Sequence, residues 1–428
     1  MKVYFYTLGC KVNQYETEVM REEFEKYGIM MADEKEKFDI AVINSCSVTA
    51  ESDRKTRQAL HRIRRQNPEA VIVLTGCMVQ AFPKEAESFL DADIIIGNTD
   101  VKKTVEKTVE FLKEKKRFFE VCPHLRNESF NTPILSSFAE RTRAYMKIED
   151  GCERYCTYCI IPYARGFVRS KPLDEIKKEA KALAKNGFSE IVLVGINLTS
   201  YGKGEDINLC DAVEAVCEIE GIKRVRLGSL EPDHISDDML LRFKAEDKFC
   251  PQFHLSLQSG CDKTLKAMNR KYDTAFYRDL VLRIRKIFPD SAITTDIMVG
   301  FAGETEEDFN ESLSFAKEIG FAKAHIFCYS RREGTIAFNM PNQVTKAEKH
   351  RRSIELSKAC KKTEEKFLSS LIGQQQEVLF ETEENGFFEG FTKNYSRVRV
   401  MSTKDLSGKC LNCLIKELDG EILIGELI

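Results

Sequence analysis

The chain has 428 residues, of which 43% are hydrophobic and 31% charged, and its formal net charge is -3. This length favours two or three domains, and the composition is that of a folded, soluble protein. The sequence contains neither a run of about 18 apolar residues nor a signal peptide, so we expect a cytoplasmic protein without a membrane partner. Because the net charge is slightly negative, any binding of nucleic acid must depend on local basic patches.

The first segment, residues 1–120, alternates apolar strands with amphipathic helices, which predicts a parallel α/β sheet. A cysteine follows each of the first three strands within two residues: Cys10, Cys46 and Cys77. Because the carboxyl ends of parallel strands share one edge of a sheet, the three thiols can converge there. The expected strands cover residues 2–8, 39–45, 70–76 and 92–97, and the expected helices cover 15–28, 51–65 and 83–90.

A polar stretch with two prolines, residues 121–138, predicts a linker to a second α/β segment at 139–371. Six strand-like runs alternate there with helical patterns that end in glycine. Six βα units predict a partial (β/α)6 barrel of the TIM type, with its active site at the carboxyl ends of the strands. The expected strands are 143–149, 190–196, 224–230, 252–257, 292–299 and 323–329.

The last segment, residues 372–428, changes to short strands separated by turns. This pattern predicts a small antiparallel β-barrel of a kind that often binds nucleic acid. Cys410 and Cys413 form a C-x-x-C pair there, a spacing that suits zinc or redox chemistry, but no partner pair is nearby and packing is favoured. The expected strands are 376–381, 386–392, 396–401 and 421–428.

The strongest local motif is C-x3-C-x2-C, formed by Cys152, Cys156 and Cys159 after the first barrel strand. In a reducing compartment such thiols favour metal binding over disulfides. Three thiolates can hold three irons of a 4Fe-4S cluster and leave the fourth iron open. The open iron can chelate S-adenosylmethionine (SAM), whose reductive cleavage gives a 5'-deoxyadenosyl radical. A zinc knuckle would need a fourth ligand nearby, and His124 and His234 are both distant in sequence.

This motif resembles that of the radical SAM superfamily, and the whole chain resembles the methylthiotransferase family, with its N-terminal cluster domain, radical SAM core and C-terminal TRAM domain. The segments TLGCKVNQYE, NSCSVT and TGCMVQ match the family's cysteine motifs. The resemblance implies that Cys10, Cys46 and Cys77 bind a second 4Fe-4S cluster and that Tyr158 lies beside the SAM adenine. It also implies that one SAM methylates a sulfur on that cluster, while a second SAM supplies the radical.

Further candidate SAM contacts lie on later barrel strands. LVGINLTSYG and HLSLQSG resemble the family segments that contact the methionyl amino group and the ribose, although the usual Gly-Gly-Glu form of the former is absent. A guanidinium is a good partner for a carboxylate, and glycines allow the backbone to approach an adenine closely. The candidates are Gly195 and Asn197 for the amino group, Ser256 and Gln258 for the ribose, Arg270 for the carboxylate, and Gly300 and Gly303 for the adenine.

The residues after Cys10 are Lys11, Val12 and Asn13. They resemble the branch that acts on threonylcarbamoyladenosine at position 37 of transfer RNA, whereas the isopentenyladenosine branch typically has Gln-Met-Asn and the ribosomal-protein branch Pro-Lys-Asn. The resemblance implies an anticodon stem-loop as substrate and an electron donor such as flavodoxin or ferredoxin. Four alternatives stay open: the two other branches, a radical enzyme that methylates without adding sulfur, and a noncatalytic iron-sulfur RNA-binding protein.

Two basic runs are candidates for contact with RNA. Residues 54–65 contain six Lys or Arg side chains and no carboxylate, and a second basic run spans residues 346–366. Because the first run follows the Cys46 loop, we expect its helix to start beside the reaction cavity and Arg57 and Arg64 to contact phosphates. A solvated helix face explains either run equally well.

Overall fold

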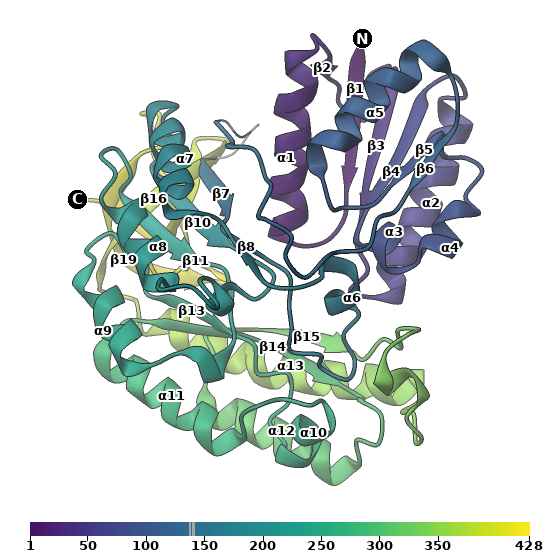
Figure 1. Ribbon diagram of the computed structural model, residues 1–428. Helices are drawn as coiled ribbons and strands as arrows, with labels where there is room; N and C mark the ends of the chain where they lie inside the picture. Colours follow the sequence, from purple (N-terminus) through teal and green to yellow (C-terminus); the bar gives the residue numbers. More distant parts are fainter. Residues whose placement is uncertain (137, 139–141) are drawn as a thin grey trace.

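The computed structural model describes all residues except 137 and 139–141. An N-terminal α/β layer, an open barrel and a small closed barrel follow one another along the chain (Figure 1). The predicted boundary at residue 139 lies outside the described residues. Within the described ranges, no helix is long and apolar enough to span a bilayer.

The N-terminal layer is a six-stranded sheet of order β2-β1-β3-β4-β5-β6, in which all neighbours pair in parallel. Every residue of β3 and β4 is buried, since helices cover both faces of the sheet, with α1 and α5 on one side and α2, α3 and α4 on the other (Figure 1). The strands are β1 Lys2–Thr7, β2 Met30–Met31, β3 Ile40–Ser45, β4 Val71–Gly76, β5 Ile94–Ile96 and β6 Phe118–Glu120. The helices are α1 Lys11–Lys26, α2 Ala50–Gln66, α3 Cys77–Ala81, α4 Pro83–Glu87 and α5 Val101–Glu114.

The four strands predicted for this layer are present, but the sequence pattern missed β2, β6, α3 and α5. It also placed the start of the first helix too late, because α1 begins at Lys11 and not at Tyr15. This difference matters for the site, since Cys10 is the residue immediately before α1 and Cys77 is the first residue of α3. Two of the three N-terminal cysteines therefore lie where a strand gives way to a helix.

All six predicted barrel strands are present, although the predicted strand 224–230 is divided into β11 and β12, and the resulting strands form two parallel sheets of order β11-β10-β7 and β12-β13-β14-β15. The edge strands β7 and β15 do not pair with each other, so the barrel is open on that side, and most of β15 is exposed. The strands are β7 Arg143–Lys147, β10 Glu190–Val194, β11 Arg224–Leu227, β12 Ser229–Leu230, β13 Gln252–Leu255, β14 Ala292–Val299 and β15 Lys323–Cys328, with the separate hairpin β8 Glu149–Asp150 and β9 Arg169–Ser170.

Helices cover the outside of the barrel (Figure 1). They are α7 Leu173–Lys185, α8 Leu209–Cys217, α9 Asp237–Ala245, α10 Asp262–Ala267, α11 Thr274–Ile287, α12 Glu306–Ile319 and α13 Lys346–Ser369, whereas the short helix α6 Ile161–Arg165 packs against the N-terminal layer. Three 3-10 turns complete this part at Leu198–Ser200, Pro232–His234 and Ile336–Asn339. As predicted, α12 stops at a glycine, Gly320, which adopts a left-handed conformation with φ +64°.

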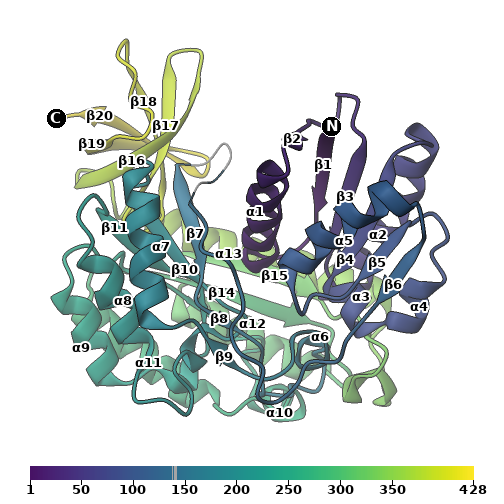
Figure 2. The same ribbon diagram turned by 45° about the horizontal axis from the view of Figure 1, so that its top comes forward.

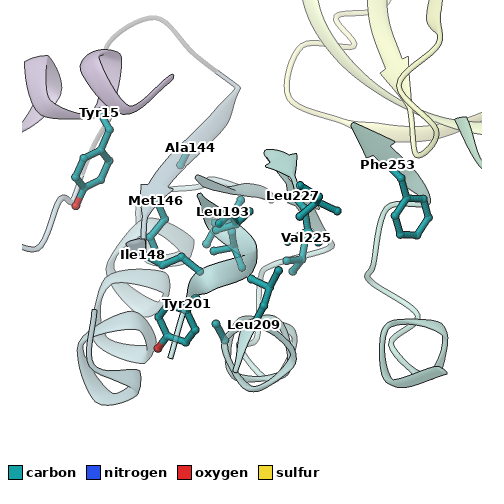
Figure 3. Close-up of a cluster of buried hydrophobic side chains, with 14 of the residues drawn as sticks. Tyr15, Ala144, Met146, Ile148, Leu193, Tyr201, Leu209, Val225, Leu227 and Phe253 are labelled. Carbon is teal, nitrogen blue, oxygen red and sulfur yellow. The ribbon is translucent and has the colours of Figure 1, made fainter. Parts of the chain in front are cut away.

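One hydrophobic core joins the N-terminal layer to the barrel (Figure 3). Tyr15 of α1 is fully buried in the same cluster as Leu193 and Val225 of the barrel strands. Its hydroxyl donates to Glu179 Oε1 of α7 at 3.0 Å. Because this core is continuous, the relative position of the N-terminal sheet edge and the barrel mouth is fixed by packing.

The C-terminal part is a closed barrel of order β16-β17-β18-β20-β19. Its pairs are antiparallel except for β18 and β20, which pair in parallel. The prediction missed β19, which carries both Cys410 and Cys413, and Cys413 packs in the apolar core of this barrel. The strands are β16 Gln375–Glu384, β17 Phe387–Thr392, β18 Arg397–Met401, β19 Cys410–Asp419 and β20 Ile422–Leu427.

Buried arginines attach the C-terminal barrel to the open barrel. Arg224 and Arg226 on β11 donate to the backbone oxygens of Phe391 at 2.8 Å and Lys393 at 2.9 Å. Arg143 on β7 forms an ion pair with Glu381 at 2.7 Å. These contacts place the closed barrel over the end of the open barrel where its strands begin (Figure 2).

Candidate active site

The carboxyl edge of the N-terminal sheet brings Cys10, Cys46 and Cys77 together. Asn13 Oδ1 lies 4.0 Å from the sulfur of Cys10 and 3.9 Å from the sulfur of Cys77. Gly9 has a φ of +104°, and a Cβ atom added there would lie 2.9 Å from the sulfur of Cys46. A glycine is therefore needed at this position for the chain to bring Cys10 against Cys46.

Burial keeps two of these thiols, Cys46 and Cys77, neutral when no metal is bound. It raises the pKa of Cys77 to about 12, although the nearby Arg165 guanidinium lowers that pKa in part. Burial also raises the pKa of Cys46. Thiolate ligands at this edge therefore need the positive charge of a bound metal, which couples loss of the thiol protons to metal binding.

The second set of cysteines lies on the loop between β8 and α6. The backbone holds the loop in place, since Cys152 N donates to Gly166 O at 2.9 Å and Cys159 N donates to Cys156 O at 3.0 Å. Arg270 Nη1 lies 3.3 Å from the sulfur of Cys156. Burial raises the pKa of Cys152 and of Cys159 to about 12, as it does at the N-terminal set.

Both sets of thiols suit a cluster better than a single metal ion. Over residues 1–136, 138 and 142–428, no three His, Cys, Asp or Glu side chains are grouped to hold one ion. A single zinc ion would need its ligands within about 2.3 Å of one point. A 4Fe-4S cluster instead takes each thiolate on a different iron, so the sulfurs lie farther apart, and three thiolates leave one iron open. The donor sets therefore fit such clusters.

A buried arginine connects the two sets of cysteines. Arg165 is the last residue of α6, just after the Cys159 loop, and its side chain is fully buried. Its Nε lies 3.1 Å from the sulfur of Cys77, and its Nη2 donates to Asn13 Oδ1 at 2.7 Å. The guanidinium also forms an ion pair with Glu16, at 2.9 Å between Nη2 and Oε2. The radical-motif loop thus contacts both α1 and α3 of the N-terminal layer.

Lys147 completes this buried charge cluster from the end of β7. Its Nζ lies 2.8 Å from Glu16 and 2.5 Å from Asp150, which precedes the Cys152 loop by two residues. Burial alone would raise the pKa of Glu16, but the coulombic effects of Arg165 and Lys147 lower it below its usual value. Two carboxylates and two cations therefore remain charged in the interior between the cysteine sets.

Sequence patterns did not identify this cluster. Arg165 and Glu16 are 149 residues apart, and each is an ordinary charged residue in an amphipathic stretch. The only local signal is the position of Arg165 in IIPYARG, directly after the third cysteine of the radical motif.

Comparisons with known proteins agree with this arrangement. Residues 2–97 match UPF0004, described as an uncharacterized protein family, and residues 146–316 match the radical SAM superfamily. Threonylcarbamoyladenosine tRNA methylthiotransferase MtaB from Bacillus subtilis (strain 168) is 37% identical over 420 residues, 96% of this chain and 93% of the relative. The tRNA-2-methylthio-N(6)-dimethylallyladenosine synthase from Endomicrobium trichonymphae is 33% identical over 426 residues, 99% of each chain. The chain belongs to the tRNA methylthiotransferase family.

This methylthiotransferase is therefore a radical SAM enzyme, which uses SAM and a 4Fe-4S cluster. Its fold resembles that of the radical SAM methyltransferase TsrM from Kitasatospora setae, with a TM-score of 0.59 and 13% identity over 79% of this chain and 74% of that one. The cobalamin-dependent radical SAM enzyme OxsB gives a TM-score of 0.51 at 11% identity, over 85% of this chain and 56% of that one. At such low identities the likeness concerns the fold alone.

Three of the predicted SAM contacts gather around the radical-motif cysteines. Arg270 reaches Cys156 and also donates to Ser256 O at 3.1 Å. The ring of Tyr158 is partly buried and meets Phe301 edge to face, with 6.3 Å between ring centroids. Arg270 is also in an ion pair with Glu231, so a SAM carboxylate would share this guanidinium with an internal partner.

A buried carboxylate that the sequence analysis did not identify adjoins the predicted amino-group contacts. Glu149 Oε2 accepts from Asn197 N at 2.7 Å, and a Cβ atom added at Gly195 would lie 2.5 Å from the same oxygen. Within the described part of the chain, Glu149 Oε1 is buried without a hydrogen-bond partner. This carboxyl group from β8 therefore adjoins both residues predicted to contact the amino group. An ammonium group would satisfy the unpaired oxygen.

The remaining predicted SAM contacts lie at the ends of β13 and β14. Gln258 has a φ of +67°, and its N donates to Asp296 O at 2.9 Å. At Gly300 an added Cβ atom would lie 2.3 Å from Lys349 Cγ, so the packing of α13 already requires a glycine there. No atom lies within 4 Å of an added Cβ at Gly303. Of the two glycines, only Gly303 has open space beside it for a ligand.

The two arginines predicted to contact RNA differ in their surroundings. Arg57 is 39% exposed and forms an ion pair with Glu85. Arg64 instead donates to the backbone oxygens of Pro68, Ala70 and Asp91 and to Asp93 Oδ2. The guanidinium of Arg64 is thus engaged with the protein, so Arg57 is the more accessible of the two to a phosphate, and contact of Arg64 with RNA stays a prediction.

Glu149 gives a prediction for the dependence of stability on pH. Burial raises the pKa of Glu149 from 4.5 to about 8. A carboxyl group whose pKa is raised in the folded state destabilises the fold when it ionises. The free energy of unfolding of the wild type should therefore fall as pH rises from about 5 to about 8. We expect Glu149→Gln to remove the loss and to stabilise the protein by on the order of 3 kcal/mol at pH 8.

Thermal unfolding of the wild type and Glu149→Gln across this pH range measures the effect. Glu220→Gln, at an exposed glutamate, is the matched control and should follow the wild type. Parallel curves for wild type and Glu149→Gln between pH 5 and 8 would contradict the raised pKa.

Proposed function

We propose that this enzyme adds a methylthio group to carbon 2 of threonylcarbamoyladenosine at position 37 of transfer RNA, with two 4Fe-4S clusters. The observation that carries the proposal is the presence of two sets of three thiols, with Arg165, six residues after Cys159, in contact with Cys77 of the other set. A single cluster would leave the N-terminal set without a role, whereas two clusters, each with an open iron, explain both sets. The Bacillus relative, a threonylcarbamoyladenosine methylthiotransferase, supports the substrate.

In this proposal the protein side chains bind the two clusters and adjust their reduction potentials. Cys152, Cys156 and Cys159 bind the radical cluster, and Cys10, Cys46 and Cys77 bind the second one. When bound, the clusters and SAM supply the electron, the radical and the methylthio group. Hydrogen bonds to cluster sulfurs adjust reduction potentials, so Arg165, which is 3.1 Å from Cys77 Sγ, and Arg270, which is 3.3 Å from Cys156 Sγ, each tune one cluster.

The predicted SAM contacts are assigned within this proposal by their surroundings. Tyr158 and Gly303 lie beside the adenine, Ser256 and Gln258 beside the ribose, and Arg270 beside the carboxylate. Gly195, Asn197 and Glu149 surround the methionyl amino group, for which Glu149 supplies the negative charge. An external donor such as flavodoxin or ferredoxin supplies the electrons.

The first prediction from this proposal concerns cluster content. We expect the wild type reconstituted under anaerobic conditions to contain about eight irons and eight sulfides, and each triple cysteine-to-alanine variant to retain about four of each. Replacing Cys152, Cys156 and Cys159 should abolish SAM cleavage. Replacing Cys10, Cys46 and Cys77 should leave cleavage to 5'-deoxyadenosine but stop methylthio transfer.

Iron and sulfide analysis with chromatography of SAM products gives these values. Loss of all iron from either triple variant, with its circular dichroism unchanged, would argue against two separate clusters. Normal methylthiolation by the N-terminal triple variant would refute a role for the second cluster.

The substrate is tested by mass spectrometry of transfer RNA nucleosides from cells lacking the gene. We expect loss of the 2-methylthio derivative of threonylcarbamoyladenosine and accumulation of the unmodified precursor. The wild-type gene should restore the product, and the N-terminal triple variant is the matched control that should not. Loss of the methylthio derivative of dimethylallyladenosine instead would assign the enzyme to the branch of its Endomicrobium relative.

We propose further that Arg57 on α2 and the C-terminal barrel contact the anticodon stem-loop. The start of α2 lies close to the mouth of the open barrel, since Ala50 N donates to Ser330 Oγ at 3.0 Å and Asp53 pairs with Arg332 at 2.5 Å. A phosphate that approaches this mouth can compete with Glu85 for the exposed Arg57 guanidinium.

Charge reversal tests this contact. Arg57→Glu should weaken stem-loop binding and reduce the slope of log affinity against log salt by about one, as loss of one phosphate contact does. The matched control is Arg278→Glu on α11, because Arg278 is 40% exposed and pairs with Glu318 as Arg57 does with Glu85. Equal affinities and slopes for the two variants would exclude Arg57 from the RNA site.

A further inference from the structure

A cavity of about 530 Å³ lies between the inner face of the open barrel and the C-terminal barrel, and it reaches the first residue of α1. This volume lies in the range of pockets that bind small ligands. The N-terminal end of α1 lies beside the edge strands β7 and β15, where the barrel is open (Figure 2). The walls of the cavity include Lys11, His254, Asp296, His325, Phe391 and Tyr395.

Lys11 lines this cavity as a cation without an internal counterion. In the described part of the chain, no carboxylate lies within ion-pair distance of its Nζ. The Nζ lies over the ring of Tyr145, 5.8 Å from the centroid. The carboxylate of Glu190 attracts the Lys11 ammonium group electrostatically, but it already pairs with Arg226 at 2.8 Å and with Arg224 at 3.6 Å. An ammonium group that is half removed from water without a partner is unfavourable, and an anion in the cavity would relieve this.

The other charged groups of the cavity wall have partners. Asp296 Oδ2 lies 3.2 Å from His254 Nε2, and Lys323 lies 3.0 Å from Glu364 and 3.5 Å from Glu421. Arg397 pairs with Glu389. Lys11 is therefore the charge in this wall that is left for a ligand.

The rest of the wall indicates what kind of ligand carries the anion. Phe391 and Tyr395 form a stacked pair, with 4.7 Å between ring centroids and 20° between planes, and they line the same cavity as polar Gln252 and Ser229. Both rings are already in contact with cations, since the guanidinium of Arg143 lies over the ring of Phe391 and that of Arg226 over the ring of Tyr395, each 4.7 Å from the centroid. The groups that remain beside Lys11 are therefore polar, and an anion carried by a small polar substituent, which can also bind Gln252 and Ser229, matches this wall better than a bare phosphate does.

We propose that Lys11 binds the carboxylate of the threonylcarbamoyl substituent and selects this adenosine over adenosines with neutral substituents. The inference rests on the proposed function, because it assigns a binding subsite for that substrate. Lys11 directly follows Cys10, so a carboxylate held by its ammonium group lies beside the second set of cysteines. Lys11 is a specificity residue in this account and takes no part in the chemistry.

The test compares two anticodon stem-loops bound to the reconstituted enzyme. One carries threonylcarbamoyladenosine, and the other carries its uncharged threoninamide analogue. A hydrogen bond to a charged group favours the first RNA by about tenfold or more in the wild type. Lys11→Gln should lose this preference while its affinity for the amide RNA stays within about twofold of the wild-type value.

Two further variants keep the result interpretable. Lys177→Gln, at an exposed lysine of α7 paired with Glu218, removes the same charge elsewhere and should keep the preference. Lys11→Met replaces Lys11→Gln if the iron content or circular dichroism of the latter departs from wild type. The readout is fluorescence anisotropy, which is independent of turnover.

Each outcome decides a separate point. If Lys11→Gln retains the tenfold preference, or if the wild type has none, the carboxylate subsite is refuted while the proposed function stands. If Lys11→Gln weakens both RNAs equally, Lys11 binds a backbone phosphate and the subsite is likewise refuted. If the wild type does not methylthiolate the threonylcarbamoyladenosine RNA at all, the proposed function fails and the subsite fails with it.

Discussion

The arrangement of this enzyme depends on the charged interaction of Arg165 with Glu16 and Asn13. A fully buried guanidinium is tolerated only when its donors and its charge are satisfied, and α1 supplies both partners. Because Arg165 follows the radical-motif loop and Glu16 follows Cys10 on α1, one interaction fixes the distance between the two sets of cysteines. Removing one partner would leave an uncompensated charge in the interior, so the interaction also prevents the two parts from separating.

The open side of the barrel is the second constraint. Since β7 and β15 do not pair, the first residue of α1, Lys11, can enter the gap between them. Lys11 thereby reaches the cavity that the C-terminal barrel closes at the end where the barrel strands begin. The closed barrel is held there by arginines of β11 and β7. The N-terminal layer, the open barrel and the closed barrel therefore all contribute to one cavity.

Much of the fold was predictable because its signals are local. Apolar runs such as residues 40–45 and 190–194 are buried on both faces, and they read as strands of a parallel sheet without further information. Short elements were missed where the pattern is weak: β2 has two residues, and β19 mixes apolar and charged side chains. The surroundings of Arg64 were not predictable, because the sequence shows a positive charge but not the carbonyl groups around it.

The sequence by itself determined the two sets of cysteines. Spacing places Cys152, Cys156 and Cys159 on one loop, and parallel strands must bring Cys10, Cys46 and Cys77 to one edge. Only the tertiary structure decided which charges are paired. Arg165 acquires its partners from α1, Glu149 meets the backbone of Asn197, and Lys11 has no carboxylate partner among the residues that the structure describes. These outcomes depend on contacts between residues far apart in the chain, which local patterns do not encode.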